Sequence, residues 1–147
     1  VHAGEVYPCR DFETALDLGI DRIGHGVFLT KYPDVLKEFN RRKIPIEVNL
    51  TSNLRIGAVS DYKSHPVETF LRSGIPVAIS TDDPGVFGID LNHEYEVLSS
   101  EIGLSTSALY SIALQGVDCL FVSDEQRKAL KEDFVRESSR CMELLRG

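Results

Sequence analysis

Short apolar runs alternate in the first half of the chain with segments whose apolar residues recur at helical spacing. The segment that opens at Pro33 is of the helical kind, because Val35, Leu36 and Phe39 fall on one helical face. The run Ile75–Ile79 is apolar throughout, as expected of a parallel strand that is covered on both faces. The predicted strands are Ile20–His25, Ile44–Leu50 and Ile75–Ile79, after a strand end near residue 3, and the predicted helices begin at Pro8, Pro33 and Pro66.

The second half of the chain has a different pattern. Residues 51 to 65 and the pair Pro84-Gly85 are predicted to be loops, and no clear strand follows them. Ser123 with Gln126 three positions later has the spacing of a capping box, which predicts a helix start at this point. The predicted helical stretches are about 91–102, 106–118 and 124–145, and the last has an apolar face of Leu130, Phe134, Met142 and Leu145.

The alternation of strands and helices predicts an α/β protein with a parallel sheet, for which two architectures are open. A doubly wound sheet usually carries a glycine-rich turn after its first strand, and HAGEVYP at residues 2–8 contains neither GxGxxG nor a P-loop pattern. The other architecture is the C-terminal half of a (β/α)8 TIM-type barrel, with about four βα units and closing helices. The chain starts at Val1 without an initiator Met, and its first strand lacks most of its body. We therefore predict that residues 1–147 are the C-terminal part of a single barrel domain, whose N-terminal half is absent.

A half-barrel leaves strand edges open, and we expect an apolar inner face to be exposed as well. The apolar residues predicted on that face are Ile46, Val48, Val77 and Ile79. The chain by itself is therefore expected to be poorly soluble or to associate with itself.

The charge balance and the cysteines narrow the class of protein. With 16 Lys and Arg against 23 Asp and Glu, the net charge of -7 argues against a protein that binds nucleic-acid phosphates. Cys9, Cys119 and Cys141 are widely spaced and form no CxxC pair, which fits a reducing compartment and predicts buried or half-buried thiols. No apolar stretch approaches the length of a membrane span, and the N-terminal residues do not resemble a signal peptide. We expect a soluble cytoplasmic protein without a membrane partner.

Polar residues gather where the predicted strands end. The segments are HAGE (2–5), IGHG (23–26), TSN (51–53) and STDD (80–83). In a barrel the loops after the strands share one opening, so side chains from these segments are expected to converge. Imidazole and carboxylate together are the ligands of catalytic zinc or iron sites. His2 and Asp82 are the candidate metal ligands.

Each of these residues also has a structural explanation. Glu5 is suited to the positive end of a following helix, Asp82 or Asp83 to capping a turn, and Asn53 to holding one. Taken together, however, their repeated placement at strand ends favours a shared site. Two other histidines, His65 and His93, have no partner in this pattern and are predicted to be hydrogen-bonded loop residues.

The segments HAGE, RIGHG, TSN with a later helix opening at HP, and STDDPGVFGIDLNHEY resemble the C-terminal half of the adenosine deaminase family, in the same order and at similar spacing. The resemblance runs from residue 1 to beyond 130 and includes GLSTSALYSIALQGVDCLFVSDEQRKAL. The combination of these motifs with STDDP is highly specific. It implies a metal-dependent barrel hydrolase of purine salvage that converts adenosine, and 2'-deoxyadenosine, to inosine and ammonia with a zinc-activated water.

The resemblance also implies a role for each strand-end residue. By similarity, His2 is a zinc ligand, and Asp82 completes the metal shell. Glu5 protonates the purine ring nitrogen beside the reacting carbon, His25 orients or deprotonates the water, and Asp83 binds the five-membered ring. Attack at an aromatic carbon needs a strong nucleophile on one side and a proton on the other. Glu5 would have to be protonated at neutral pH, which burial favours.

The chain departs from the family pattern in two places. Members use an HxH pair at the end of the first barrel strand, and this sequence contains no HxH. Two further His ligands for the single zinc ion are therefore expected from the N-terminal half of the barrel, in the same or a separate chain, and the chain alone is expected to be inactive. Where members often show Cys-Pro, this chain has Asn49-Leu50.

Three alternative functions remain open. The half-barrel can be a catalytically incomplete binding or regulatory module, and the observation behind this alternative is the missing HxH pair. It can also belong to a deaminase of a related aminopurine, such as adenine or an N6-substituted AMP. A third alternative is an amidohydrolase of another substrate class on the same barrel.

Overall fold

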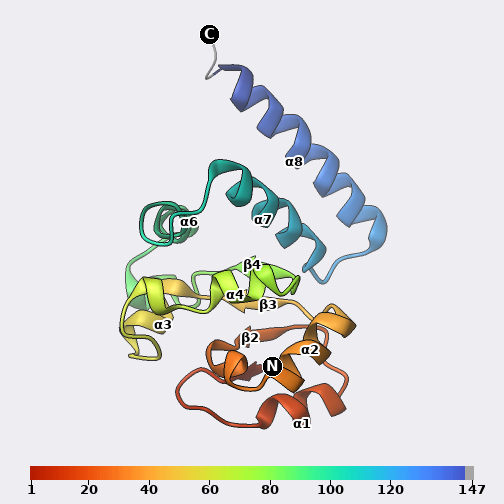
Figure 1. Ribbon diagram of the computed structural model, residues 1–147. Helices are drawn as coiled ribbons and strands as arrows, with labels where there is room; N and C mark the ends of the chain where they lie inside the picture. The colour runs from red at the N-terminus through yellow and green to blue at the C-terminus, as the bar shows by residue number, and fades with distance from the viewer. Residues whose placement is uncertain (145–147) are drawn as a thin grey trace.

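A parallel sheet of four short strands forms the centre of the molecule (Figure 1). The computed structural model of the protein describes residues 1–144, and the side chains of residues 1–141. Strands that follow one another in the sequence are also neighbours in the sheet, in the order β1-β2-β3-β4. This order has no reversal point, which is the arrangement of a barrel segment and differs from a doubly wound sheet. The strands are β1 (His2–Ala3), β2 (Ile23–His25), β3 (Ile46–Val48) and β4 (Val77–Ile79).

Helices connect the strands and continue after the last of them. Two of these segments are short 3-10 helices, η1 (Val27–Lys31) and η2 (Tyr62–Ser64). In Figure 1, α7 lies beside β4, and α8 runs away from the rest of the molecule. The α-helices are α1 (Asp11–Asp17), α2 (Pro33–Arg42), α3 (Leu50–Arg55), α4 (Val67–Arg72), α5 (Pro84–Phe87), α6 (Leu91–Ser100), α7 (Thr106–Asp118) and α8 (Asp124–Leu144).

Local sequence signals predict several helix starts correctly. Pro33 is the first residue of α2, where a missing N–H costs nothing. The capping box before α8 is confirmed, because Gln126 N donates to Ser123 Oγ at 3.2 Å and Ser123 N donates to Gln126 Oε1 at 3.0 Å. The predicted start at Pro8 is wrong, since α1 begins only at Asp11.

Two predicted loops are in fact helical. The segment 51–65 contains most of α3 and all of η2, and Pro84-Gly85 opens the one-turn helix α5. The residues of α3 from Leu50 to Asn53 are all buried, although three of them are polar. A buried helix with polar side chains has no apolar periodicity, which explains why the sequence pattern did not reveal it.

The hydrophobic core lies between the sheet and the helices that connect its strands. Phe12, Phe39 and Phe70, from α1, α2 and α4, are all fully buried in it. They pack with Ile46 and Val77 of the sheet, which are also fully buried. Fully burying side chains of this size contributes about 1.5–3 kcal/mol each.

The prediction of an exposed apolar inner face is wrong. Ile46, Val48 and Val77 are fully buried and Ile79 is half-buried, so these side chains pack against the helical layer. The residues of the opposite parity face the other side, because side chains alternate along a strand. Those residues form one row across the sheet, in which His2, Gly24, Glu47 and Ala78 are paired neighbours.

The two C-terminal helices differ in how they pack. α7 covers the free edge of β4, where Gln115 Oε1 accepts a hydrogen bond from Val77 N at 2.9 Å. α8 contacts α7 through Phe134, whose ring centroid lies 5.4 Å from that of Tyr110. On its predicted apolar face Leu130 is exposed, and the side chains of Met142 and Leu145 lie outside the described part. Within residues 1–144, no helix is both long and apolar enough to span a bilayer.

The cysteines follow the packing of the elements that carry them. Cys119 at the end of α7 is buried and Cys9 is half-buried, as predicted. Cys141 is exposed, so the prediction for this residue is wrong. It lies on α8, most of whose surface is in contact with solvent.

Candidate active site

Three residues from the first two strand ends meet at one place. His2 lies in β1, Glu5 follows that strand, and His25 ends β2. One potential ligand atom from each lies within 4.8 Å of the other two. His25 Nε2 is 3.5 Å from Glu5 Oε2, and the rings of His2 and His25 meet edge to face at 4.8 Å between centroids. We call this group of His2, Glu5 and His25 the strand-end cluster.

The backbone around the cluster is specialised for close packing. A side chain at Gly24 would collide with the His2 ring, since its Cβ would lie 2.7 Å from His2 Cδ2. His25 itself has φ 69° and Asp82 has φ 58°, both in the left-handed region that non-glycine residues rarely adopt. Such backbone strain persists only where the surrounding structure enforces it, and it is typical of functional sites.

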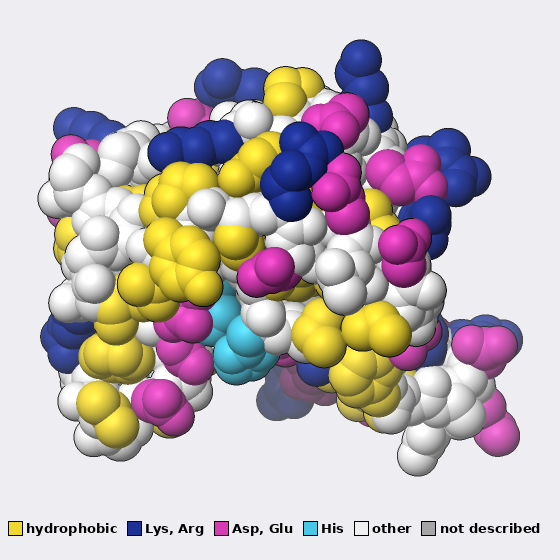
Figure 2. Space-filling view, turned by 90° about the horizontal axis from the view of Figure 1, so that it is seen from below, with side chains coloured by type: hydrophobic (Ala, Val, Ile, Leu, Met, Phe, Trp, Pro, Cys, Tyr) yellow, Lys and Arg dark blue, Asp and Glu magenta, His cyan; other side chains and the backbone are white. Residues whose placement is uncertain are grey.

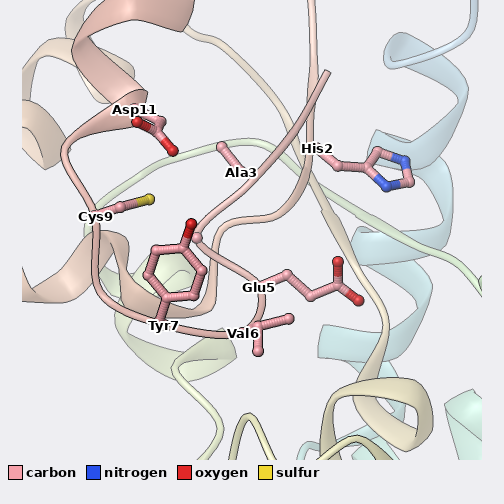
Figure 3. A pocket seen from close by; sticks show the side chains of 8 residues that line it. His2, Ala3, Glu5, Val6, Tyr7, Cys9 and Asp11 are labelled. Atoms are coloured by element: carbon pink, nitrogen blue, oxygen red, sulfur yellow. The ribbon is translucent and has the colours of Figure 1, made fainter.

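The cluster joins a buried side to an open side. His25 is almost fully buried, whereas His2 is exposed and Glu5 is half-buried. His2 and Glu5 line a cavity of about 220 Å³, whose other lining residues are Ala3, Gly4, Val6, Tyr7, Cys9 and Asp11. Figure 3 shows their side chains directed to the same side, away from Cys9 and Asp11. Figure 2 shows histidine and acidic side chains next to one another on this face of the molecule.

The acidic pair after β4 lies near the cluster without being part of it. Ser52 Oγ donates to Asp82 Oδ2 at 2.6 Å, which fixes the orientation of this carboxylate. Burial lowers the pKa of His25, and the negative charge of Asp82 partly opposes this shift. Asp83 is exposed at the N-terminus of α5, but its side chain makes no capping hydrogen bond there. Turn capping therefore does not explain the Asp83 side chain.

A network of buried polar side chains lies behind His25. The Nδ2 atoms of Asn49 and Asn53 lie 3.0 and 3.1 Å from His25 Nδ1. Asn53 Oδ1 in turn lies 3.2 Å from His65 Nε2, and Val67 N donates to His65 Nδ1 at 3.2 Å. Asn53, expected at the rim, thus lies beneath His25. His65 is hydrogen-bonded as predicted, in the interior.

The buried environment controls the charge of both histidines. Burial lowers the pKa of His25 below its usual value, although the carboxylates of Glu5 and Asp82 oppose this shift. Burial also lowers the pKa of His65, to about 4. The His65 ring is therefore neutral at pH 7, which suits a hydrogen-bonding role better than a charge-pairing role.

The sequence pattern did not reveal Glu94 as part of this region. This residue of α6 is fully buried, and both of its carboxylate oxygens accept from Thr51 N, at 3.2 and 3.3 Å. It thereby fastens α6 to the N-terminus of α3, where a negative charge is favourable. The signal in the sequence is a carboxylate that shares a helix face with Val97 and Leu98. The neighbouring His93 lies in α6 and is not a loop residue, which corrects that prediction.

The strand-end cluster has the chemistry of a metal centre. Two imidazoles and a carboxylate are ligands that zinc takes in catalytic sites, where a further position stays open for water. The ligand atoms are close enough to share one ion. The partial exposure of His2 and Glu5 leaves the open side accessible to a substrate.

Comparison with known proteins agrees with this description. A family model described as adenosine deaminase matches residues 1–137. The adenosine deaminase of Aliivibrio fischeri strain ES114 is 42% identical over 133 residues, which are 90% of this chain and 40% of that protein. The chain thus spans about 40% of the length of the curated relatives it matches.

Solved structures show the same arrangement of elements. Adenine deaminase from Arthrobacter aurescens superimposes with a TM-score of 0.88 at 29% identity, over 94% of this chain and 42% of that one. N6-methyl-AMP deaminase from Arabidopsis thaliana superimposes with a TM-score of 0.86 at 30% identity, over 95% of this chain and 41% of that one. An amidohydrolase from Burkholderia ambifaria with bound zinc superimposes with a TM-score of 0.86 at 26% identity, over 98% of this chain and 41% of that one. The fold is therefore that of a TIM-barrel amidohydrolase segment, and the chain belongs to the adenosine deaminase family.

Proposed function

We propose that residues 1–147 form the C-terminal part of a single barrel domain that hydrolyses adenosine to inosine and ammonia. The observation that carries this proposal is the strand-end cluster, in which His2, Glu5 and His25 converge within 4.8 Å. Family membership and the 42% identity to an adenosine deaminase support the same activity. The remaining part of the barrel would supply the rest of the site.

Zinc is the proposed cofactor, with His2 and Asp82 as the ligands that this chain contributes. Imidazole and carboxylate are ligand types that zinc takes, and a structural relative was crystallised with bound zinc. A bound zinc ion supplies a strong nucleophile from water near neutral pH. Two further histidine ligands would come from the N-terminal half of the barrel. Ser52 holds the Asp82 carboxylate in place through its hydrogen bond of 2.6 Å.

The other residues of this chain handle protons and substrate. Glu5 is the proposed donor of a proton to the purine ring nitrogen next to the reacting carbon. Its Oε2 lies 3.5 Å from His25 Nε2, so the two groups face the same small volume. Protonating the ring there would let it accept the electron pair of the attacking water. His25 is proposed to act on the attacking water, and the exposed Asp83 to hydrogen-bond the five-membered ring of the purine.

The test is an assay of the full-length protein with zinc, which follows the loss of adenosine absorbance. Turnover is expected, and it should fall strongly in a Glu5→Gln variant that keeps the side-chain size. Glu13→Gln is the matched control, because Glu13 is exposed on α1 and pairs with Arg10 outside the site. A zinc-loaded full-length protein without any turnover of adenosine would contradict the proposal. If the full-length sequence lacks an HxH pair, a binding or regulatory half-barrel becomes the better explanation.

A related aminopurine is the second candidate substrate. Adenine deaminase and N6-methyl-AMP deaminase superimpose on nearly the whole chain at 29% and 30% identity. Adenosine is favoured because the identity to an adenosine deaminase is higher. Parallel assays with adenosine, 2'-deoxyadenosine, adenine and N6-methyl-AMP would separate these substrates. A kcat/KM for adenine or N6-methyl-AMP above that for adenosine would reassign the substrate within the family.

A further inference from the structure

The hydrogen bonds behind His25 form a continuous chain whose direction is fixed at one end. That end is the backbone N–H of Val67, which can only donate, and it donates to His65 Nδ1 at 3.2 Å. His65 Nδ1 therefore carries no proton. The side chains of His65, Asn53 and His25 are 4%, 0% and 1% exposed, so bulk water cannot replace any of the partners.

The bare Nδ1 of His65 fixes which group donates in the next hydrogen bond, between His65 and Asn53. A neutral imidazole with a bare Nδ1 has its proton on Nε2, so His65 Nε2 donates to Asn53 Oδ1 at 3.2 Å. The ring stays neutral at pH 7 because burial lowers its pKa to about 4. With Oδ1 engaged, the other end of the Asn53 amide is Nδ2, which carries only donors. It lies 3.1 Å from His25 Nδ1, and this ring nitrogen must accept.

Asn49 presents a second donor to the same atom. Its Nδ2 lies 3.0 Å from His25 Nδ1, and its Oδ1 is buried without a hydrogen-bond partner among the described residues. The reversed amide would bring Oδ1 against the bare ring nitrogen and leave Nδ2 unpartnered, which loses a hydrogen bond. The direction that Asn53 fixes at His25 Nδ1 therefore also sets the orientation of the Asn49 amide.

The reverse assignment of donors and acceptors along this chain conflicts with the backbone N–H of Val67. A proton on His25 Nδ1 would require an oxygen of Asn53 to face it, and Asn53 Nδ2 would then face His65 Nε2. His65 would have to carry its proton on Nδ1, against the N–H of Val67 at 3.2 Å. Two donors would meet there, and a backbone N–H cannot be reversed.

We propose that Asn53 and His65 are positioning residues that hold His25 in the tautomer with a bare Nδ1 and a proton on Nε2. This atom faces Glu5 Oε2 at 3.5 Å, on the side of the strand-end cluster. The inference rests on the proposed function for its catalytic meaning and deepens it. With a proton already on Nε2, His25 donates a hydrogen bond to the oxygen of the attacking water and orients it. It does not take a proton from that water.

The tautomer can be read directly by NMR of the full-length protein with 15N-labelled histidine. Long-range 1H–15N correlation spectra distinguish protonated from bare ring nitrogens, and histidine variants assign the signals. We expect His25 and His65 each to carry the proton on Nε2. A His25 proton on Nδ1 would overturn the proposal. No substrate is needed, so an absence of deaminase activity would refute the proposed function and leave the tautomer result unaffected.

Near-isosteric variants test the two positioning residues. Asn53→Asp replaces the donor by an acceptor, so the His25 proton should move to Nδ1, and kcat should fall about 10²-fold or more at a similar KM. Asn40→Asp is the matched control, because Asn40 lies on α2 and its oxygen accepts from Lys43, a contact that a carboxylate keeps. His65→Gln retains a donor for Asn53 and should retain the tautomer, whereas His65→Leu should not. An Asn53→Asp protein in which His25 keeps its proton on Nε2 would contradict the proposal.

Discussion

The two sides of the candidate site are built in different ways. Behind His25 a chain of buried hydrogen bonds runs from the backbone N–H of Val67 through His65 and Asn53. In front, His2 is exposed and Glu5 is half-buried in the loop after β1. We refer to these as the fixed side and the open side. In the proposed function this difference separates two tasks, because the fixed side would set the orientation of one side chain and the open side would meet the substrate.

The comparison predicts that the open side can be changed with a large loss of activity and little loss of stability. In the full-length enzyme, Glu5→Gln should lower kcat by about 10³-fold, within the range for a lost proton donor. Its melting temperature should stay close to that of the wild type, because Glu5 is partly solvated. Steady-state kinetics and calorimetry measure both quantities. A variant that melts much earlier would show that the open side is also structural.

The fixed side should make stability depend on pH. Burial lowers the pKa of His65 to about 4 in the folded protein, against about 6.5 in the unfolded chain. Below pH 6.5 the unfolded state therefore binds more protons, and stability falls until about pH 4. The loss amounts to about 3 kcal/mol at most, since each pKa unit corresponds to about 1.4 kcal/mol. Urea unfolding of the wild type and of His65→Gln at several pH values checks this, and a variant with the same pH dependence would exclude His65 as its source.

The contact between α6 and α3 extends the fixed side. Glu94→Ala removes both acceptors of Thr51 N in a fully buried place, and should destabilise the protein by about 1–3 kcal/mol. Glu96→Ala is the matched control, because Glu96 is exposed on the same helix. Chemical denaturation measures the difference. Equal stability of the two variants would mean that Glu94 does not anchor these helices.

A methyl group added at Gly24, which lies between the fixed side and the open side, should displace the His2 ring. Gly24→Ala places a Cβ 2.7 Å from His2 Cδ2 and must displace that ring. We expect zinc affinity of the full-length protein to fall about 10-fold, as for the loss of a group that orients a ligand. Gly116→Ala is the control, since a Cβ there meets nothing within 4 Å. Metal competition assays give the affinities, and unchanged binding would argue against His2 as a ligand.

The sequence predicted the open side better than the fixed side, for a physical reason. His2, Glu5 and His25 stand out because charged or titratable groups at the ends of apolar runs are conspicuous. The helix α3 does not stand out, because its buried residues include Thr51, Ser52 and Asn53, which lack apolar periodicity.

The same limit applies to the faces of the sheet. The alternation in β3 shows that Glu47 points opposite to Ile46 and Val48, but not which side the helices cover. Only the packing of α1, α2 and α4 decides that Ile46 and Val48 belong to the core. Glu47 thus stays on the other face, where it pairs with Arg22 at 3.1 Å.

The left-handed backbone at His25 and Asp82 has a consequence for protein engineering. Most replacements at these two positions would keep the strain and discard the chemistry, while glycine would release the strain and discard the chemistry too. A library selected for thermal stability alone should therefore enrich glycine at both positions and drift toward inactive variants. Screens on this scaffold need an activity readout in every round, because selection for stability favours glycine at these two positions and selection for activity favours His25 and Asp82.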